Sequence, residues 1–186
     1  MPASVRVFAI SGSLRKASYN TGLLRAARDV APQGMVIDVH PGLGDIPPYD
    51  EDVRVAGYPA AVADLREKVV LADALLFASP EFNRGMSGVL KNAIDWLSRL
   101  PGPPLLGKPA CVMTAATGAL AGSLANYDMR RVLSVCGAFV LPGREIMVGD
   151  ARNKFDGEGN LTDASIREFI ETHLNSLKSF VDRHRI

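Results

Sequence analysis

The chain is poor in the residues that build disulfide scaffolds, metal centres and membrane spans. It has two cysteines among 186 residues, Cys111 and Cys136, each in or at the end of an apolar run. Two thiols form neither a disulfide framework nor a good metal site, so we expect ordinary buried thiols and predict no metal. Charge, glycine or proline interrupts each apolar run before it reaches the length of a membrane span.

An excess of charge of one sign is also missing. Lysine and arginine number 21 against 20 aspartates and glutamates, which leaves a net charge of +1. This balance gives no indication of a nucleic acid or a membrane surface as a partner. Residues 1–6 run directly into a strand-like segment and lack the apolar core of a signal peptide, so we expect a cytoplasmic protein.

What the chain does contain is a regular alternation of strand-like and helix-like segments in a composition that is 47% hydrophobic. We expect one domain over residues 1–186. The predicted strands are 5–10, 35–40, 74–78, 110–114 and an interrupted fifth region over 139–148. The predicted helices are 19–31, 60–72, 87–100, 122–136 and 163–183, with a long loop over 41–57. This alternation predicts an α/β fold with a doubly wound, five-stranded parallel sheet and helices on both faces. The flavodoxin-like strand order 2-1-3-4-5 fits it best.

Hydroxyl, amide and guanidinium groups gather after the first predicted strand, at Ser11, Ser13, Arg15, Ser18, Asn20 and Thr21. A phosphate monoester suits the start of a helix, where backbone amides are free and the dipole end is positive. Arg15 adds a planar fork for the charge. An ordinary helix cap and a solvated arginine explain the stretch about equally well. It is neither G-x-G-x-x-G nor a G-K-[ST] P-loop, which disfavours a dinucleotide fold or a phosphotransferase.

Two further turns follow the third and fourth predicted strands. The second turn, stiffened by proline, contains Pro80, Glu81, Phe82, Asn83 and Arg84. It could hold a planar ring, although a simple strand-to-helix connection explains it better when it is taken alone. The third turn, with Ala116, Thr117 and Gly118, lets backbone amides approach a ligand, although small residues also make tight turns. Because ligands bind beyond the carboxyl ends of parallel strands, the three turns together predict an FMN site.

The helix over 87–100 is apolar around much of its girth. Val89 and Trp96 widen the apolar stripe, and a helix of this kind often packs on two sides, one of which could be a partner subunit. On its polar side, Asp95 precedes Arg99 by four residues, which favours an ion pair within the helix.

These segments resemble the NADPH-dependent FMN reductase family, flavodoxin-like enzymes that include quinone and chromate reductases. The matching stretches are 12–15 with Ser18 and Asn20, then 79–83, 88–96, 107–109 and 117–119. The resemblance implies that Ser13, Arg15, Ser18 and Asn20 hold the FMN phosphate. It also implies that residues 80–84 and 117–118 embrace the isoalloxazine ring. Phe82 stands where family members usually carry tyrosine, so the hydrogen bond of that hydroxyl is lost while ring packing can persist.

The resemblance implies a mechanism without a catalytic side chain. NADPH (or NADH) passes hydride to flavin N5, and the flavin reduces a small-molecule acceptor such as a quinone, another flavin or a metal oxyanion such as chromate. Backbone amides of residues 117–119 are the candidates for stabilising the reduced ring. His40, His173 and His184 fall at a strand end and in the last helix, where structural or solvated roles are expected.

Two other functions stay open at this point. A flavodoxin-type electron carrier would also bind FMN, but such carriers are expected to show a strongly acidic face, whereas the charges here nearly cancel. A flavodoxin-like enzyme with another ligand is the third hypothesis. We also expect a homo-oligomer, a dimer or a tetramer, with Tyr49 of the long loop closing an interface or lining the acceptor pocket.

Overall fold

The computed structural model describes residues 4–184. Residues 1–3, part of the segment in which a signal peptide was sought, lie outside the described residues. The strands are β1 (Val5–Ser11), β2 (Met35–Val39), β3 (Ala74–Ser79), β4 (Pro109–Ala115), β5 (Phe139–Val140) and β6 (Ile146–Val148). The helices are α1 (Tyr19–Asp29), α2 (Glu51–Ala56), α3 (Ala60–Leu71), α4 (Gly88–Ser98), α5 (Ser123–Val135) and α6 (Ala164–His184), with a short 3-10 turn at Ala151–Asn153.

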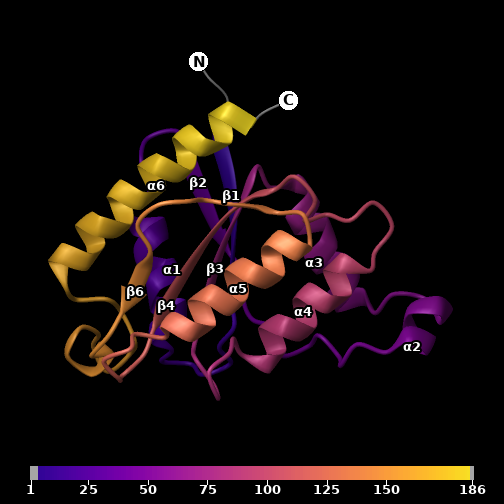
Figure 1. Ribbon diagram of the computed structural model, residues 1–186, viewed down its shortest axis with the longest axis horizontal. Coiled ribbons are helices and arrows are strands. Elements are labelled where there is room, and N and C mark those ends of the chain that lie inside the picture. The colour runs from indigo at the N-terminus through magenta and orange to yellow at the C-terminus, as the bar shows by residue number, and fades with distance from the viewer. Residues whose placement is uncertain (1–3, 185–186) are drawn as a thin grey trace.

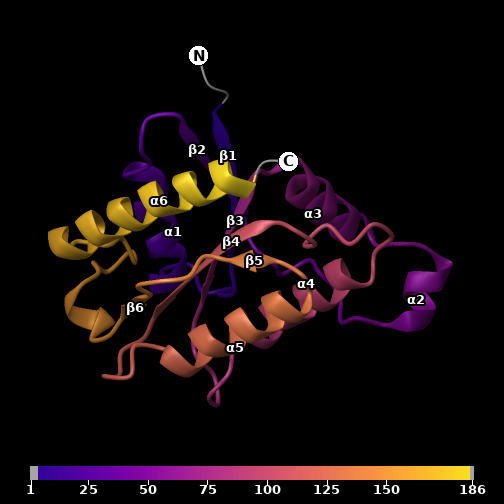
Figure 2. The same ribbon diagram turned by 45° about the horizontal axis from the view of Figure 1, so that its top comes forward.

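All paired strands run parallel, in the order β2-β1-β3-β4-β5, and β6 also pairs with β4 (Figure 1; β5 is labelled in Figure 2). The predicted α/β class and strand order are therefore confirmed. The fifth position of the sheet is shared by two short strands, because Pro142 and Gly143 interrupt the run between them. Proline cannot donate to a strand ladder, which is why pairing with β4 stops and then resumes.

The sheet divides two hydrophobic cores. Alternate residues of β1, such as Val7 and Ala9, pack with α1 and α6, while Phe8 and Ile10 face the side of α3 and α4. Figure 2 shows the two layers of helices with the sheet between them. Every residue of β3 and β4 is buried, which explains why these strands are apolar except for Ser79 and Thr114 near their carboxyl ends. No helix in the described part of the chain is long and apolar enough to cross a membrane.

The long loop is partly helical and covers the second apolar side of α4. Its helix α2 projects at the right of Figure 1 and buries none of its residues. The segment before α2 lies on Trp96, whose Nε1 donates to the Pro47 carbonyl at 2.8 Å and whose ring packs edge-on to Tyr49. Trp96 is fully buried within its own chain. The wide apolar girth of α4 is therefore accounted for without a second subunit.

The polar side of α4 agrees with the prediction. The Asp95 carboxylate lies 3.4 Å from the Arg99 guanidinium and 2.6 Å from the Lys91 ammonium. It therefore forms ion pairs with the cations one helical turn before it and one turn after it. Both cysteines are free thiols. Cys111 is buried, as expected, but Cys136 is only partly buried, because it lies at the C-terminal end of α5. Burial raises the pKa of the Cys111 thiol to about 12, so this side chain is protonated and unreactive at neutral pH.

Candidate functional site

The three candidate turns begin side by side at the carboxyl edge of the sheet. Ser11 at the end of β1 pairs with Ala78, and Ser79 at the end of β3 pairs with Thr114 in β4. The chain therefore leaves three neighbouring strands at nearly the same level. The paired residues are 67 and 35 positions apart in the sequence, and the register brings them to one edge, where open parallel sheets bind their ligands.

The first turn is organised as a helix start. Ser18 caps α1 by accepting from the Thr21 amide at 3.3 Å. Below it, the Ser11 and Thr21 hydroxyls lie 2.7 Å apart, and the Ser13 amide donates to Ser11 Oγ at 3.2 Å. Ser11 is almost fully buried. Ser11 and Thr21 therefore support the turn from beneath. The Thr21 and Gly22 amides bond to Ser18, so the amides of Tyr19 and Asn20 are the ones at the start of α1 that suit an anion.

Arg15 is exposed at the mouth of this turn. Its guanidinium carbon lies 4.6 Å from the centre of the Tyr19 ring, so the ring face holds the positive charge beside the start of α1. A fork of N–H donors here suits a phosphate group.

Asn20 links the first turn to the third. Its Nδ2 donates to the Ala115 carbonyl at 3.0 Å, and its Oδ1 accepts from the Ala115 amide at 2.9 Å. Asn20 is only 3% exposed, so these are buried bonds. The side chain pairs with the end of β4 as a neighbouring strand would, and its second N–H is left for a ligand.

The second turn is a tight hairpin that stands out from the sheet. Phe82 and Gly85 exchange backbone hydrogen bonds of 3.0 and 3.1 Å around Asn83 and Arg84, whose φ angles are +50° and +71°. Two successive positive φ angles are the signature of a type I′ turn, which matches the twist of the strands that it joins. Phe82 is 60% exposed, so its ring is available to a ligand or a partner.

The first and second turns pack closely because Gly12 has no side chain. A Cβ at Gly12 would lie 2.5 Å from Ser87 Oγ and 3.0 Å from Ser79 Oγ. Ser79 Oγ in turn accepts from the Ser87 amide at 3.0 Å and donates to the Pro80 carbonyl at 2.8 Å. Glycine is required at position 12 by this close approach.

A hollow of about 270 Å³ lies among the three turns. Its lining includes nine of the predicted site residues: Ser13, Arg15, Ser18, Asn20, Pro80, Glu81, Phe82, Ala116 and Thr117. Tyr19 and Ala115 also line it; both lie in the candidate turns but were not among the predicted ligands. Their positions in the sequence could have indicated them, because Tyr19 follows the helix cap Ser18 and Ala115 ends the strand β4. Ser11, Thr21, Asn83, Arg84 and Gly118 are not part of the lining.

The histidines lie away from this hollow. His40 and His173 are mostly buried, and burial with the nearby Arg130 charge lowers the pKa of His173 to about 4. His173 is therefore neutral near pH 7. These positions agree with the structural roles expected for them, and the hollow's lining contains no histidine or cysteine.

The residues present fit FMN. The first turn offers hydroxyls, a guanidinium and free helix amides for a phosphate, and the second and third turns form two walls for a planar ring. The fold thus defines a flavodoxin-like α/β protein, and the hollow at the carboxyl edge of its sheet suits a flavin.

Comparison with known proteins gives the particular family. The family model described as NADPH-dependent FMN reductase matches residues 5–153. An NAD(P)H-dependent FMN reductase of Pseudomonas aeruginosa is 44% identical to this chain, and a quinone reductase of Escherichia coli is 37% identical. Each match covers 100% of both chains. The solved structure of FerB from Paracoccus denitrificans, a flavoenzyme NAD(P)H:(acceptor) oxidoreductase, aligns with a TM-score of 0.87 at 28% identity and covers 98% of this chain and all of that one.

The chain belongs to the NADPH-dependent FMN reductase family. It is an NAD(P)H-dependent reductase, and FMN and NAD(P)H are its cofactors. The resemblance drawn from the sequence motifs is confirmed.

Proposed function

We propose that this protein uses NADPH (or NADH) and FMN to reduce a quinone or a similar small acceptor, with free flavin and metal oxyanions such as chromate as further acceptors. The observation that carries the proposal is the single hollow shared by a phosphate-type helix start and two ring walls. Curated relatives named as quinone reductases support the choice of acceptor. Anaerobic reduction by NADPH, followed by addition of a quinone or chromate, tests it.

The roles of the residues follow from their positions. Ser13, Ser18 and Arg15 hold the phosphate at the start of α1, and Pro80, Phe82 and Thr117 hold the ring. When bound, FMN supplies an N5 atom that takes hydride from NADPH and a ring system that passes electrons to the acceptor. The Ala116 amide already donates to the Val148 carbonyl at 2.9 Å, so the amides that follow it are the candidates for balancing negative charge on the ring.

A flavodoxin-type electron carrier is the alternative. It would hold FMN through the same turns but would need a protein partner to be reduced or oxidised. Such a carrier is expected to be strongly acidic where it docks, whereas the charges of this chain nearly cancel, +1 overall. The enzyme is therefore the better supported of the two.

The Arg15→Ala variant is expected to bind FMN about tenfold to a hundredfold more weakly than the wild type. The loss corresponds to one charged hydrogen bond of about 1.5–3 kcal/mol. Titration of the apoprotein with FMN, followed by flavin fluorescence, measures the change. Lys16→Ala, an exposed basic neighbour outside the hollow's lining, is the matched control. Equal affinities for wild type and Arg15→Ala would remove Arg15 from the phosphate site.

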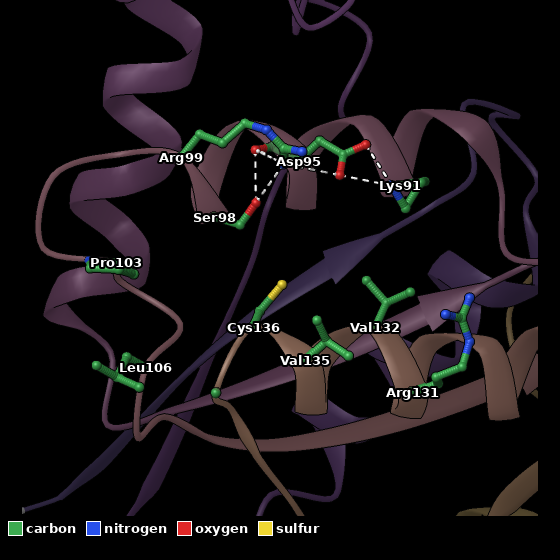
Figure 3. A pocket seen from close by; sticks show the side chains of 11 residues that line it. Lys91, Asp95, Ser98, Arg99, Pro103, Leu106, Arg131, Val132, Val135 and Cys136 are labelled. Carbon is green, nitrogen blue, oxygen red and sulfur yellow. Dashed lines mark hydrogen bonds and ion pairs between the residues drawn. The ribbon is translucent and has the colours of Figure 1, made fainter.

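We also propose that two copies associate through the groove between α4 and α5. Figure 3 shows this hollow of about 490 Å³, whose lining includes Leu106 and Val135. These side chains are 67% and 81% exposed, which is unusual for large apolar groups. Along the rim, the charges of Lys91, Asp95 and Arg99 alternate. Such a row matches its own copy when the two-fold axis passes between Asp95 and one of the two cations, so that each Asp95 carboxylate faces a cation of the other copy.

The Val135→Glu variant is therefore expected to elute as a monomer where the wild type elutes as a dimer. A carboxylate brought into this contact would have to leave water, and that desolvation costs several kcal/mol. Gel filtration with light scattering measures the mass. Val36→Glu, on the exposed side of β2, makes the same chemical change away from the groove and should leave the dimer intact. A wild-type monomer that binds FMN and turns over would contradict the proposal.

A further inference from the structure

Glu81 connects the second turn to the beginning of α5. Its Oε2 atom accepts from the Leu124 amide at 3.0 Å and from the Ala125 amide at 3.2 Å. Both amides belong to the first turn of α5, more than 40 residues further along the chain. The carboxylate of the Pro-Glu-x-Asn turn is thus engaged with backbone groups of another segment.

Helix α5 lacks a cap of its own. Gly122 occupies its N-cap position with φ of +76° and has no side chain, and the first turn of α5 contains no acidic residue. By contrast, α1 and α4 are capped locally by Ser18 and Ser87. Free amides at a helix start are stabilised by an acceptor and by negative charge. Glu81 therefore caps α5 from a distant segment, whereas the caps of α1 and α4 are serines next to each helix.

The third turn is consequently held at both ends by side chains of the other two turns. Asn20 holds Ala115, where the third turn begins, and Glu81 holds the first turn of α5, where it ends. The residues between, 116–122, are mostly alanine and glycine and have little side chain with which to fix themselves. A second link points the other way, because Asp128 Oδ2 of α5 accepts from the Met86 amide at 3.2 Å.

We infer that Glu81 is a positioning residue: its carboxylate caps α5 and so fixes the separation of the two walls of the ring site, and it does not bind the flavin itself. This inference rests on the proposed function, in which the ring lies between the second and third turns. It separates the role of Glu81 from those of Phe82 and Thr117, which line the same hollow and are proposed to hold the ring.

The test moves the carboxylate from the second turn to α5. Glu81→Ala removes the cap, and Ser123→Asp places a carboxylate in the first turn of α5 itself. Position 123 is preferred to position 122, where a Cβ would lie 3.0 Å from Thr114 Cβ. Four proteins are compared with the wild type: the two single variants, the double variant and Glu67→Ala, a control that removes an exposed carboxylate from α3.

Two quantities are measured on each protein, the Tm of the apoprotein and the Kd for FMN. Glu81→Ala is expected to lower the apoprotein Tm by about 2–4 °C, the size of a lost helix cap in a chain of this length. It is also expected to weaken FMN binding about threefold to tenfold, because the two walls are no longer held together. The double variant should regain at least half of both losses, and Glu67→Ala should change neither.

Recovery in the double variant is the result that a direct ligand would not give. If Glu81→Ala weakens FMN binding without lowering the apoprotein Tm, or if the double variant regains Tm but not FMN affinity, Glu81 contacts the flavin and the inference is wrong. If the Tm values follow the expected pattern while the wild type itself fails to bind FMN, the cap stands and the proposed function fails.

Discussion

Replacing Asn20 with alanine is expected to weaken FMN binding on the order of a hundredfold and to lower the free energy of unfolding by about 2–4 kcal/mol. The substitution leaves the Ala115 amide and carbonyl without the partners that they have in the wild type. Each buried group left unsatisfied costs about 1–3 kcal/mol. The third turn then loses its attachment to the first turn, and both line the hollow.

Urea unfolding of the apoprotein and FMN titration measure the two effects separately. Asn175→Ala, an exposed asparagine on α6 that bonds only to its own helix, is the control and should alter neither. A hundredfold loss of FMN affinity with unchanged stability would contradict the bracing role and make Asn20 a phosphate ligand alone.

Replacing Trp96 with alanine is expected to lower the free energy of unfolding by about 3–5 kcal/mol, the usual cost of deleting a large buried aromatic side chain. Trp96 is fully buried, and its Nε1 holds the Pro47 carbonyl of the long loop. Trp96→Phe keeps most of the ring volume and is expected to cost about 1–2 kcal/mol for the lost hydrogen bond and the smaller ring.

Far-UV circular dichroism in urea measures these changes, since tryptophan fluorescence is lost with the only tryptophan. The destabilisation should be the same at low and high protein concentration, because Trp96 packs within its own chain. A loss that depends on protein concentration would place Trp96 in a subunit contact and contradict the packing described.

The sequence predicted the core elements within a few residues because their signals are local. Strands β3 and β4 are apolar over most of their length, and α1 begins at a serine cap before a helical apolar period. The short helix α2 was missed because it buries no residue and so leaves no apolar period. Its signal was the run of Asp50, Glu51 and Asp52, in which the Asp50 side chain accepts from the Asp52 amide.

The packing of α4 could not be predicted from the period of its apolar residues alone. Its two apolar sides were visible in the sequence, but no pattern states which segment covers the second side. A partner subunit was considered for that side, and in the structure the chain's own residues before α2 cover Trp96. The case for a dimer therefore rests on the groove with Leu106 and Val135 instead.

In the candidate site, the sequence predicted which turns come together but not how they are joined. Ser18 capping its own helix is a local feature and was expected. The bonds of Asn20 to Ala115 and of Glu81 to Leu124 join positions 95 and 43 residues apart, and they depend on the register of the sheet. The sequence suggested Asn20 and Glu81 as ligands because they are polar and lie at the carboxyl edge of the sheet. Their hydrogen-bond partners are distant along the chain, so the sequence alone does not show them.

The most direct test of the central claim is the absorption spectrum of the FMN-loaded protein under anaerobic conditions, before and after NADPH and then after a quinone. Our account predicts a flavin spectrum that bleaches rapidly on adding NADPH and recovers when the quinone is added. A bound flavin that NADPH does not reduce would contradict the reductase and favour the electron carrier. Absence of any flavin spectrum after incubation with FMN would contradict the assignment of the site itself.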